Sequence, residues 1–236
     1  MNAAHTTPAH TPTSPDQAEG ALHLHFSQYW HAGSGRGSGY HLDALCERDA
    51  NGLPTLPGRQ LKGVLRHAVR RAEAWGWLTN LSPLPDGPLQ DHETLIFGSQ
   101  SQAEHRNATQ PGMLRVDSAH LPEKESRWLA APEQHAIRAE LFAELFSTAI
   151  NEQGSAQRYS LRGTEVCLPV TLQCTLALAI TATHDDLRAQ QAAYLKAGTG
   201  WAVLLTALPL IDTLGAHRSR GLGEVRLELI APGQGA

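Results

Sequence analysis

One carboxylate in this sequence stands at the end of a glycine-rich segment. Asp43 closes the run HAGSGRGSGYHLD at residues 31–43. A carboxylate beside such a loop can hold a metal ion or act as a general base, and it can equally serve as the cap of a turn. His31 and His41 lie toward the two ends of the loop and are candidate proton carriers, because histidine titrates near neutral pH. The alternating glycines let the backbone approach a ligand closely, or they form a flexible hairpin.

The basic residues are concentrated rather than spread along the chain. The net charge is −4, so the chain carries no global basic field. Sixteen of the 19 cations are arginines, whose planar guanidinium grips phosphate, and five of the 19 lie between Arg59 and Arg71. Within that segment Lys62, Arg66 and Arg70 are four residues apart and share one face of a predicted helix. This face either binds phosphate or is an ordinary solvated surface.

A second cationic segment, GAHRSRGLG at residues 215–223, lies near the C-terminus. Arg218 and Arg220 on a glycine-rich turn suit a nucleic-acid backbone that crosses the turn, or else a tight connection with solvated arginines. The segment PGRQLKG at 57–63 opens the basic helix. Its N-terminal N–H groups, together with Lys62, could bind a phosphate.

The sequence lacks the common nucleotide and metal fingerprints. It has no GxxxxGK[ST] motif and no HExxH motif, and the first glycine loop does not contain GxGxxG. The three cysteines form no CxxC motif, which argues against a disulfide scaffold and a four-cysteine zinc site and predicts buried side chains. His23 and His25 alternate with leucines and therefore point off the core face of a strand, where metal binding is open to them.

Hydrophobic periodicity predicts seven main elements. In chain order they are a strand at 22–29, a helix at 59–77, a strand at 113–119, a helix at 133–147, a strand at 166–181, a helix at 201–214 and a strand at 225–229. With the 133–147 helix set aside as an addition, the order is βαββαβ. It predicts an α+β fold with an RRM-like, ferredoxin-like core and long insertions. A generic α+β domain and two small subdomains remain open as alternatives.

The chain divides into a tail and one domain. Residues 1–20 are rich in Pro, Thr and Ala without periodicity, which predicts a disordered tail. Residues 21–232 then form a single domain with insertions at about 79–112 and 147–163, the first of them mobile around Ser99–Pro111. No stretch approaches the ~20 apolar residues that a membrane helix needs, and the polar N-terminal segment lacks the apolar h-region of a signal peptide. We therefore expect a cytoplasmic protein with no membrane partner.

Four segments, in this order, resemble the RAMP superfamily of CRISPR-associated proteins, and within it the backbone subunits of type III effector complexes. They are HAGSG leading through DALCERD into GLPTLPGRQLKGVLRHAV, IFGS followed by GMLRVDSAHL, STAINEQGSAQRYSLRGTEVCLPVTL, and LIDTLGAHRSRGLGEVRLEL. The resemblance spans about residues 22–230. It departs from the family pattern where Arg59-Gln60 replaces Ser-Ser and where Ile150-Asn151-Glu152 replaces Ile-Asp-Arg.

The resemblance implies a subunit that binds guide RNA along its backbone and works with target RNA, other effector subunits and copies of itself. It places Asp43 where the family carries a loop aspartate that cuts target RNA with a divalent metal, Mg²⁺ or Mn²⁺. The same aspartate would then be the metal ligand. The residues that we expect to contact RNA are Arg36, Arg59, Lys62, Arg66, Arg158, Arg162, His217, Arg218 and Arg220.

Two other functions remain open for such a sequence. A non-catalytic structural RAMP subunit, type IV-like or guide-capping, would use Asp43 only as a loop cap. A metal-independent guide-processing endoribonuclease would instead use histidine chemistry, with His31 or His41 as candidates.

Overall fold

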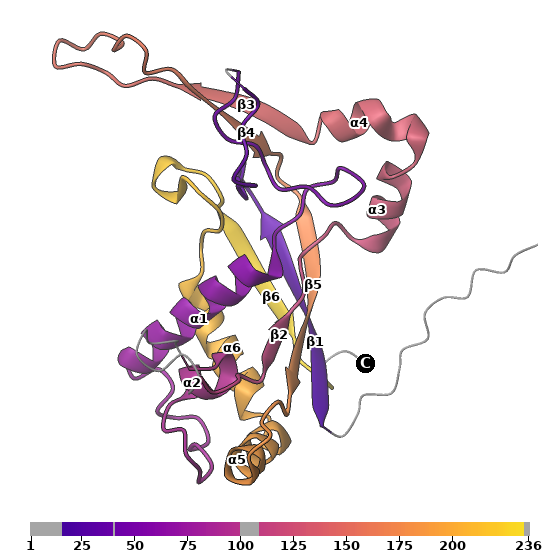
Figure 1. Ribbon diagram of the computed structural model, residues 1–236, viewed down its shortest axis with the longest axis vertical. Helices are drawn as coiled ribbons and strands as arrows, with labels where there is room; N and C mark the ends of the chain where they lie inside the picture. The colour runs from indigo at the N-terminus through magenta and orange to yellow at the C-terminus, as the bar shows by residue number, and fades with distance from the viewer. Residues whose placement is uncertain (1–15, 40, 100–108, 234–236) are drawn as a thin grey trace, which may run out of the picture.

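The computed structural model describes residues 16–39, 41–99 and 109–233 (Figure 1). Most of the predicted tail, and the middle of the segment expected to be mobile around Ser99–Pro111, lie outside these residues. The prediction of a disordered tail is wrong for its last residues, because strand β1 (Gln17–Phe26) begins at Gln17. Gln17 to Gly20 pair with the C-terminal end of β5. Backbone hydrogen bonds therefore hold these residues in a strand, although their side chains show no alternation of apolar and polar residues.

The central sheet contains four strands in the order β2-β5-β1-β6, and every neighbouring pair is antiparallel. Its other members are β2 (Leu114–Val116), β5 (Thr171–Ala179) and β6 (Val225–Ile230). Side chains of β1 alternate between the two faces, as the sequence predicts. Leu22 and Leu24 are fully buried on one face, and His23 and His25 lie on the other face.

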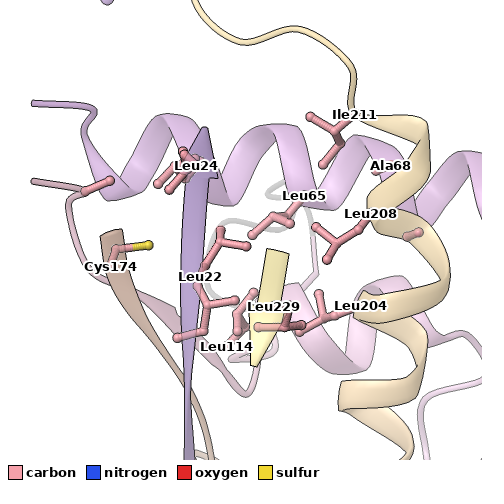
Figure 2. Packing of buried hydrophobic residues seen from close by; sticks show 14 of the residues in the cluster. Leu22, Leu24, Leu65, Ala68, Leu114, Cys174, Leu204, Leu208, Ile211 and Leu229 are labelled. Atoms are coloured by element: carbon pink, nitrogen blue, oxygen red, sulfur yellow. The ribbon is translucent and has the colours of Figure 1, made fainter. Parts of the chain in front are cut away.

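Helices cover the leucine face of this sheet (Figures 1 and 2). The longest is α1 (Gly58–Ala74), and α6 (Thr199–Ala207) packs beside it. Most of the predicted apolar positions of α1 are buried, but the helix ends at Ala74 and the predicted core residue Trp75 is 56% exposed. Figure 2 shows Leu65 near Leu22 and Ala68 near Leu208. Each fully buried leucine contributes about 1.5–3 kcal/mol of hydrophobic stabilisation, so this layer is the main core of the protein.

Three further helices form in segments whose apolar residues show no helical periodicity in the sequence. They are α2 (His92–Phe97), α3 (Glu123–Leu129) and α5 (Asp185–Lys196). Short 3-10 turns are η1 (Pro132–Gln134), η2 (Leu208–Leu210) and η3 (Arg218–Arg220). The α6 helix ends before Pro209 rather than reaching residue 214, because proline has no N–H for a helix interior. Every helix within the described residues is too short or too polar to span a membrane.

Two further predictions about secondary structure are wrong. The helix expected over 133–147 shrinks to α4 (His135–Ala139), and the remainder forms strand β3 (Phe142–Ser147). The long strand expected over 166–181 is two strands, because β4 (Arg162–Cys167) ends before Pro169 and β5 begins after it. β3 and β4 pair with each other in a second sheet. Leu141, Phe142, Leu145 and Phe146 have helical spacing, but the ladder with β4 decides their conformation.

Candidate nucleic-acid interface

The β3–β4 hairpin extends away from the central sheet, at the top of Figure 1. Its connecting segment, residues 148–161, carries large apolar side chains that are exposed, and Tyr159 is 96% exposed. Arg158 and Arg162 are exposed on the same hairpin. Aromatic faces and arginines in one exposed segment are the side chains that stack on nucleic-acid bases and pair with phosphates.

Asp43 is attached to the start of β4. Its backbone N–H donates to the Gly163 carbonyl at 2.8 Å, and the Gly163 N–H donates to Asp43 Oδ2 at 2.9 Å. A side chain at position 163 would not fit, because its Cβ would lie 2.8 Å from the His41 carbonyl oxygen. Glycine here lets the loop and the strand touch, and this contact places the carboxylate beside the hairpin.

Arg162 is the charged neighbour of this carboxylate. Its Nη1 lies 3.8 Å from Asp43 Oδ1, and the two side chains are 65% and 51% exposed. The structure therefore brings together two predicted site residues that are far apart in the sequence. Oδ2 accepts the Gly163 N–H, which is the capping role that the sequence left open for Asp43. Oδ1 faces Arg162, and the half-exposed Asp43 side chain is accessible to a ligand.

The two candidate proton carriers have different environments. His41 is exposed, and its Nε2 lies 3.1 Å from both carboxylate oxygens of Glu144 on β3. His31 is buried, with Nδ1 2.6 Å from the Glu165 carbonyl oxygen. The Cys46 thiol at 3.5 Å is the main cause that raises the pKa of His31. His31 is thus part of a buried thiol–imidazole cluster, and His41 is the histidine at the surface.

The same buried cluster supports the loop that carries Asp43. Glu165 accepts the Cys46 N–H at 2.9 Å and pairs with Arg48 at 2.6 Å. A hydrogen bond with Cys167 is the main cause that lowers the pKa of the Cys46 thiol. The three cysteines are free and buried, as predicted. These buried polar contacts fix the loop to β4 and leave the Asp43 carboxylate on the outside.

The glycine-rich loop folds back on the segment that follows it. Gly33 pairs with Cys46, and the Leu45 N–H donates to the Arg36 carbonyl at 2.9 Å. A Cβ at Gly37 would lie 3.0 Å from the Asp43 carbonyl oxygen. The backbone of the glycine-rich loop at Gly37 is therefore in close contact with the backbone of Asp43. Arg36 is exposed on the same folded loop as the carboxylate.

The C-terminal glycine-rich loop reaches the base of the hairpin. The Ala216 N–H donates to the His31 carbonyl at 2.8 Å, which fixes the loop to the first glycine-rich segment. His217 and Arg220 line a hollow of about 240 Å³ whose other walls belong to β3, β4 and the loop itself. Those walls are Leu145, Phe146, Ser147, Thr164 and Leu222. Arg218 is exposed beside them.

The predicted cations of α1 do not share one environment. Arg59 is exposed. Lys62 Nζ donates to the Leu114 carbonyl at 2.6 Å, and burial lowers the pKa of this amine. Arg66 binds Glu93 at 2.6 Å and the Gly98 carbonyl at 2.7 Å.

The helix N-terminus is also engaged within the protein. The Gly58 N–H donates to Ser118 Oγ at 3.2 Å. The Gly58 N–H and Lys62, two of the donors expected to bind a phosphate, therefore already bind protein oxygens. Of the three residues of this helix that we expected to contact RNA, Arg59 is the exposed one.

A family model for the RAMP superfamily matches residues 23–226. The chain belongs to the RAMP superfamily. A search among curated proteins found no match. As a RAMP protein, the chain is similar in fold to subunits of type III-B Cmr complexes of known structure.

Two such structures can be compared with this RAMP chain. A chain of "Type III-B Cmr-beta Cryo-EM structure of the Apo state" has a TM-score of 0.53 and 11% identity. A chain of "Cryo-EM structure of the Type III-B Cmr-beta bound to cognate target RNA" has a TM-score of 0.58 and 10% identity. Each match covers 89% of this chain and 96% of the other chain. At such low identity the likeness shows the fold.

Sequence reasoning missed three groups of contacts around the predicted site residues. Glu144 pairs with His41, Glu93 pairs with the cations of α1, and the exposed apolar residues of the hairpin were not considered as contacts. One signal for the last group was present, because Ile150, Tyr159 and Leu161 lie in a segment that reads as a polar excursion. Large apolar side chains in an exposed excursion indicate a binding surface.

Proposed function

We propose that this RAMP protein is a guide-RNA-binding backbone subunit of a CRISPR effector ribonucleoprotein in antiviral defence. The observation that carries the proposal is the convergence of Asp43, Arg162 and the His217–Arg220 loop at the base of an exposed, aromatic and basic hairpin. Its partners in this proposal are guide RNA, target RNA, other effector subunits and copies of itself. We expect it in the cytoplasm, where both RNAs are available.

The proposal includes an RRM-like core. Support comes from the antiparallel order β2-β5-β1-β6, with α1 between β1 and β2 in the chain and α5 and α6 between β5 and β6. This is the split βαβ connectivity of ferredoxin-like folds. The departures, the β3–β4 hairpin above all, are additions between β2 and β5 that carry the interface.

In this proposal the protein contacts the phosphates and the base faces of the RNA, and it recognises the shape of the RNA rather than its sequence. Arg36, Arg158, Arg162, Arg218 and Arg220 are exposed around the hairpin and can each pair with a phosphate. Tyr159 presents an open ring on which a base can stack. Sequence readout is then left to base pairing between guide and target, as in other RNA-guided systems. Affinity should fall as salt rises, in proportion to the phosphates contacted.

Cutting of the paired target RNA is the catalytic part of the proposal. Asp43 Oδ1 is the oxygen that would hold a divalent ion, Mg²⁺ or Mn²⁺. A single half-exposed carboxylate fits such an ion when RNA phosphate oxygens and water supply the other ligands. When bound, the ion would neutralise charge that develops on the phosphate. Arg162, 3.8 Å from Oδ1, would bind and orient that phosphate.

The test uses the protein co-expressed with its neighbouring genes and purified with any RNA it retains. Sequencing should recover short RNAs that share a repeat-derived 5′ segment. Asp43→Asn keeps an oxygen for the Gly163 N–H but removes the charge, so it should abolish metal-dependent cutting and keep RNA binding. Asp212→Ala, an exposed aspartate next to the C-terminal loop, is the matched control. Preparations free of RNA, or loss of RNA binding by Asp43→Asn, would contradict the proposal.

A specific observation favours a second candidate, the non-catalytic structural RAMP subunit. Asp43 already accepts the Gly163 N–H and faces Arg162, which is what a structural cap requires. Complexes that carry Asp43→Asn and still cut target RNA would support this role. Cutting of repeat RNA by the isolated protein in EDTA would instead favour the guide-processing nuclease, with His41 and Glu144 as its acid–base pair.

A further inference from the structure

Two histidines and a glutamate meet on the sheet face that the helices α1 and α6 leave uncovered. His23 and His25 are two residues apart on β1, so their side chains share this face. Glu228 on β6 is the direct cross-strand partner of His23. One ligand atom from each of the three side chains can be chosen so that all lie within 4.8 Å of one another. Among the described residues, this is the one group of histidines, cysteines and carboxylates with such spacing.

The hydrogen bonds of His25 leave one ring nitrogen without a partner. Nδ1 lies 3.1 Å from Thr171 Oγ1 on β5, the strand on the other side of β1. Nε2 is buried and has no hydrogen-bond partner among the described residues, and it lies 3.6 Å from Glu228 Oε2. When Nδ1 carries the proton and donates to Thr171, the Nε2 lone pair faces a carboxylate. Two acceptors in this arrangement are stabilised when a cation lies between them.

We propose that His23, His25 and Glu228 bind a divalent transition-metal ion, with Zn²⁺ as the main candidate. Two imidazoles and one carboxylate are a common ligand set for zinc, and the fourth position stays open to water. Imidazole ligands favour zinc, copper, nickel or cobalt over Mg²⁺, which prefers oxygen ligands. This site is separate in chemistry and place from the proposed Mg²⁺ or Mn²⁺ site at Asp43.

A metal ion at this site must displace the cation that lies beside Glu228, which is Arg226. Arg226 Nη1 lies 3.9 Å from Glu228 Oε2, and its side chain is highly exposed. An exposed ion pair of this kind is worth little, so Arg226 can move away when a metal ion arrives. Thr171 stays in place as the group that orients His25, which is the usual role of a partner to a metal-binding histidine.

The direct test is a zinc titration of the full-length, untagged chain against a chromophoric chelator. Wild type should bind one Zn²⁺ in this site. His25→Ala and Glu228→Gln should lower the affinity by more than about 100-fold, and Thr171→Val by about 10- to 100-fold. Arg226→Ala and His67→Ala, which leave all three ligands intact, should keep full affinity. Circular dichroism will show that each variant is folded.

A second readout reports on geometry. Co²⁺ in place of Zn²⁺ should give the intense visible absorption of tetrahedral coordination in wild type, and His23→Ala should lose it. The proposal is overturned if the double variant His23→Ala/His25→Ala binds Zn²⁺ as tightly as wild type does. Asp43→Asn should leave zinc affinity unchanged, so the result is independent of the proposed role in RNA cutting.

Discussion

The helix α1 and the β3–β4 hairpin both carry cations, yet only one of them presents most of its cations to solvent. In α1, Lys62 and Arg66 donate to oxygens from other parts of the chain. In the hairpin, Arg158 and Arg162 are exposed beside apolar side chains that are exposed as well. Spacing along a helix shows which cations share a face, and the partners brought by the fold decide whether those cations remain available.

Glu93 is the residue that most strongly engages the cations of α1. It accepts from Arg66 and from Arg70, and Arg70 is the main cause of its lowered pKa. Glu93→Gln removes the charge from a mostly buried carboxylate whose main partner, Arg70, is about half exposed, so we expect a loss of about 1.5 kcal/mol in the free energy of unfolding at neutral pH. RNA affinity should change little. Urea denaturation measures the first effect, and exposed Glu133→Gln is the control.

The same variant gives a pH test whose sign follows from the pKa. Because the folded-state pKa of Glu93 is lowered, its contribution is present above its unfolded value, about 4.3, and is lost as pH falls through the lower folded value. Wild type and Glu93→Gln should therefore differ most above about pH 5 and converge in stronger acid. A constant difference at all pH values would mean that charge is not the cause.

In the hairpin, Tyr159 should matter for binding and not for stability. Its ring is almost fully exposed, so Tyr159→Ala should change the free energy of unfolding by no more than about 0.5 kcal/mol. Loss of a stacked base should weaken RNA binding by about 1–3 kcal/mol. Filter binding at fixed salt measures this. Trp128→Ala, an exposed aromatic on α3, is the matched control, and an equal loss in both variants would contradict a specific role for the hairpin.

Arg59 and Lys62 form a matched pair within α1. Lys62→Met removes the hydrogen bond to Leu114, so it should cost about 1.5 kcal/mol of stability with little effect on RNA affinity. Arg59→Met should do the reverse, because Arg59 is exposed and free to reach a phosphate. Thermal unfolding and RNA binding of the two variants should separate them. The comparison fails if Lys62→Met weakens RNA binding more than Arg59→Met does.

The smallest effect is expected at a single exposed arginine of the C-terminal loop. Arg220→Gln should leave stability unchanged and lower the slope of log affinity against log salt by about one. Binding isotherms at several salt concentrations give the slope. Glu224→Gln, which lies close by in sequence, should not reduce it.

Periodicity predicted the parts of the fold whose side chains alternate against one core. The apolar stripe of α1 is found as expected up to Ala72, and so is the alternation of β1 and β5, whereas the predicted stripe residue Trp75 is exposed. The 133–147 segment shows the limit of this signal. Its apolar spacing fits a helix, and pairing with a strand some 20 residues later overrides that spacing.

The site was less accessible to sequence reasoning than the fold. The resemblance to RAMP proteins singled out Asp43, but the contact with Gly163 joins residues 120 positions apart. The partners of Lys62 and Arg66 are likewise 52 and 27 positions away. Local patterns identify cations and carboxylates, and only the folded chain shows which of them neutralise each other.

The position of β1 also has a consequence for synthesis of the protein. This first strand lies between β5 and β6, and Gln17 pairs with Ala179, about 160 residues later in the chain. At translation rates of about 5–20 residues per second, β1 waits roughly ten to forty seconds until both partners are made. During that time both backbone edges of β1 lack their hydrogen-bonded neighbours. Ribosomes that stop before the last strand would therefore release chains whose first strand is open to aggregation.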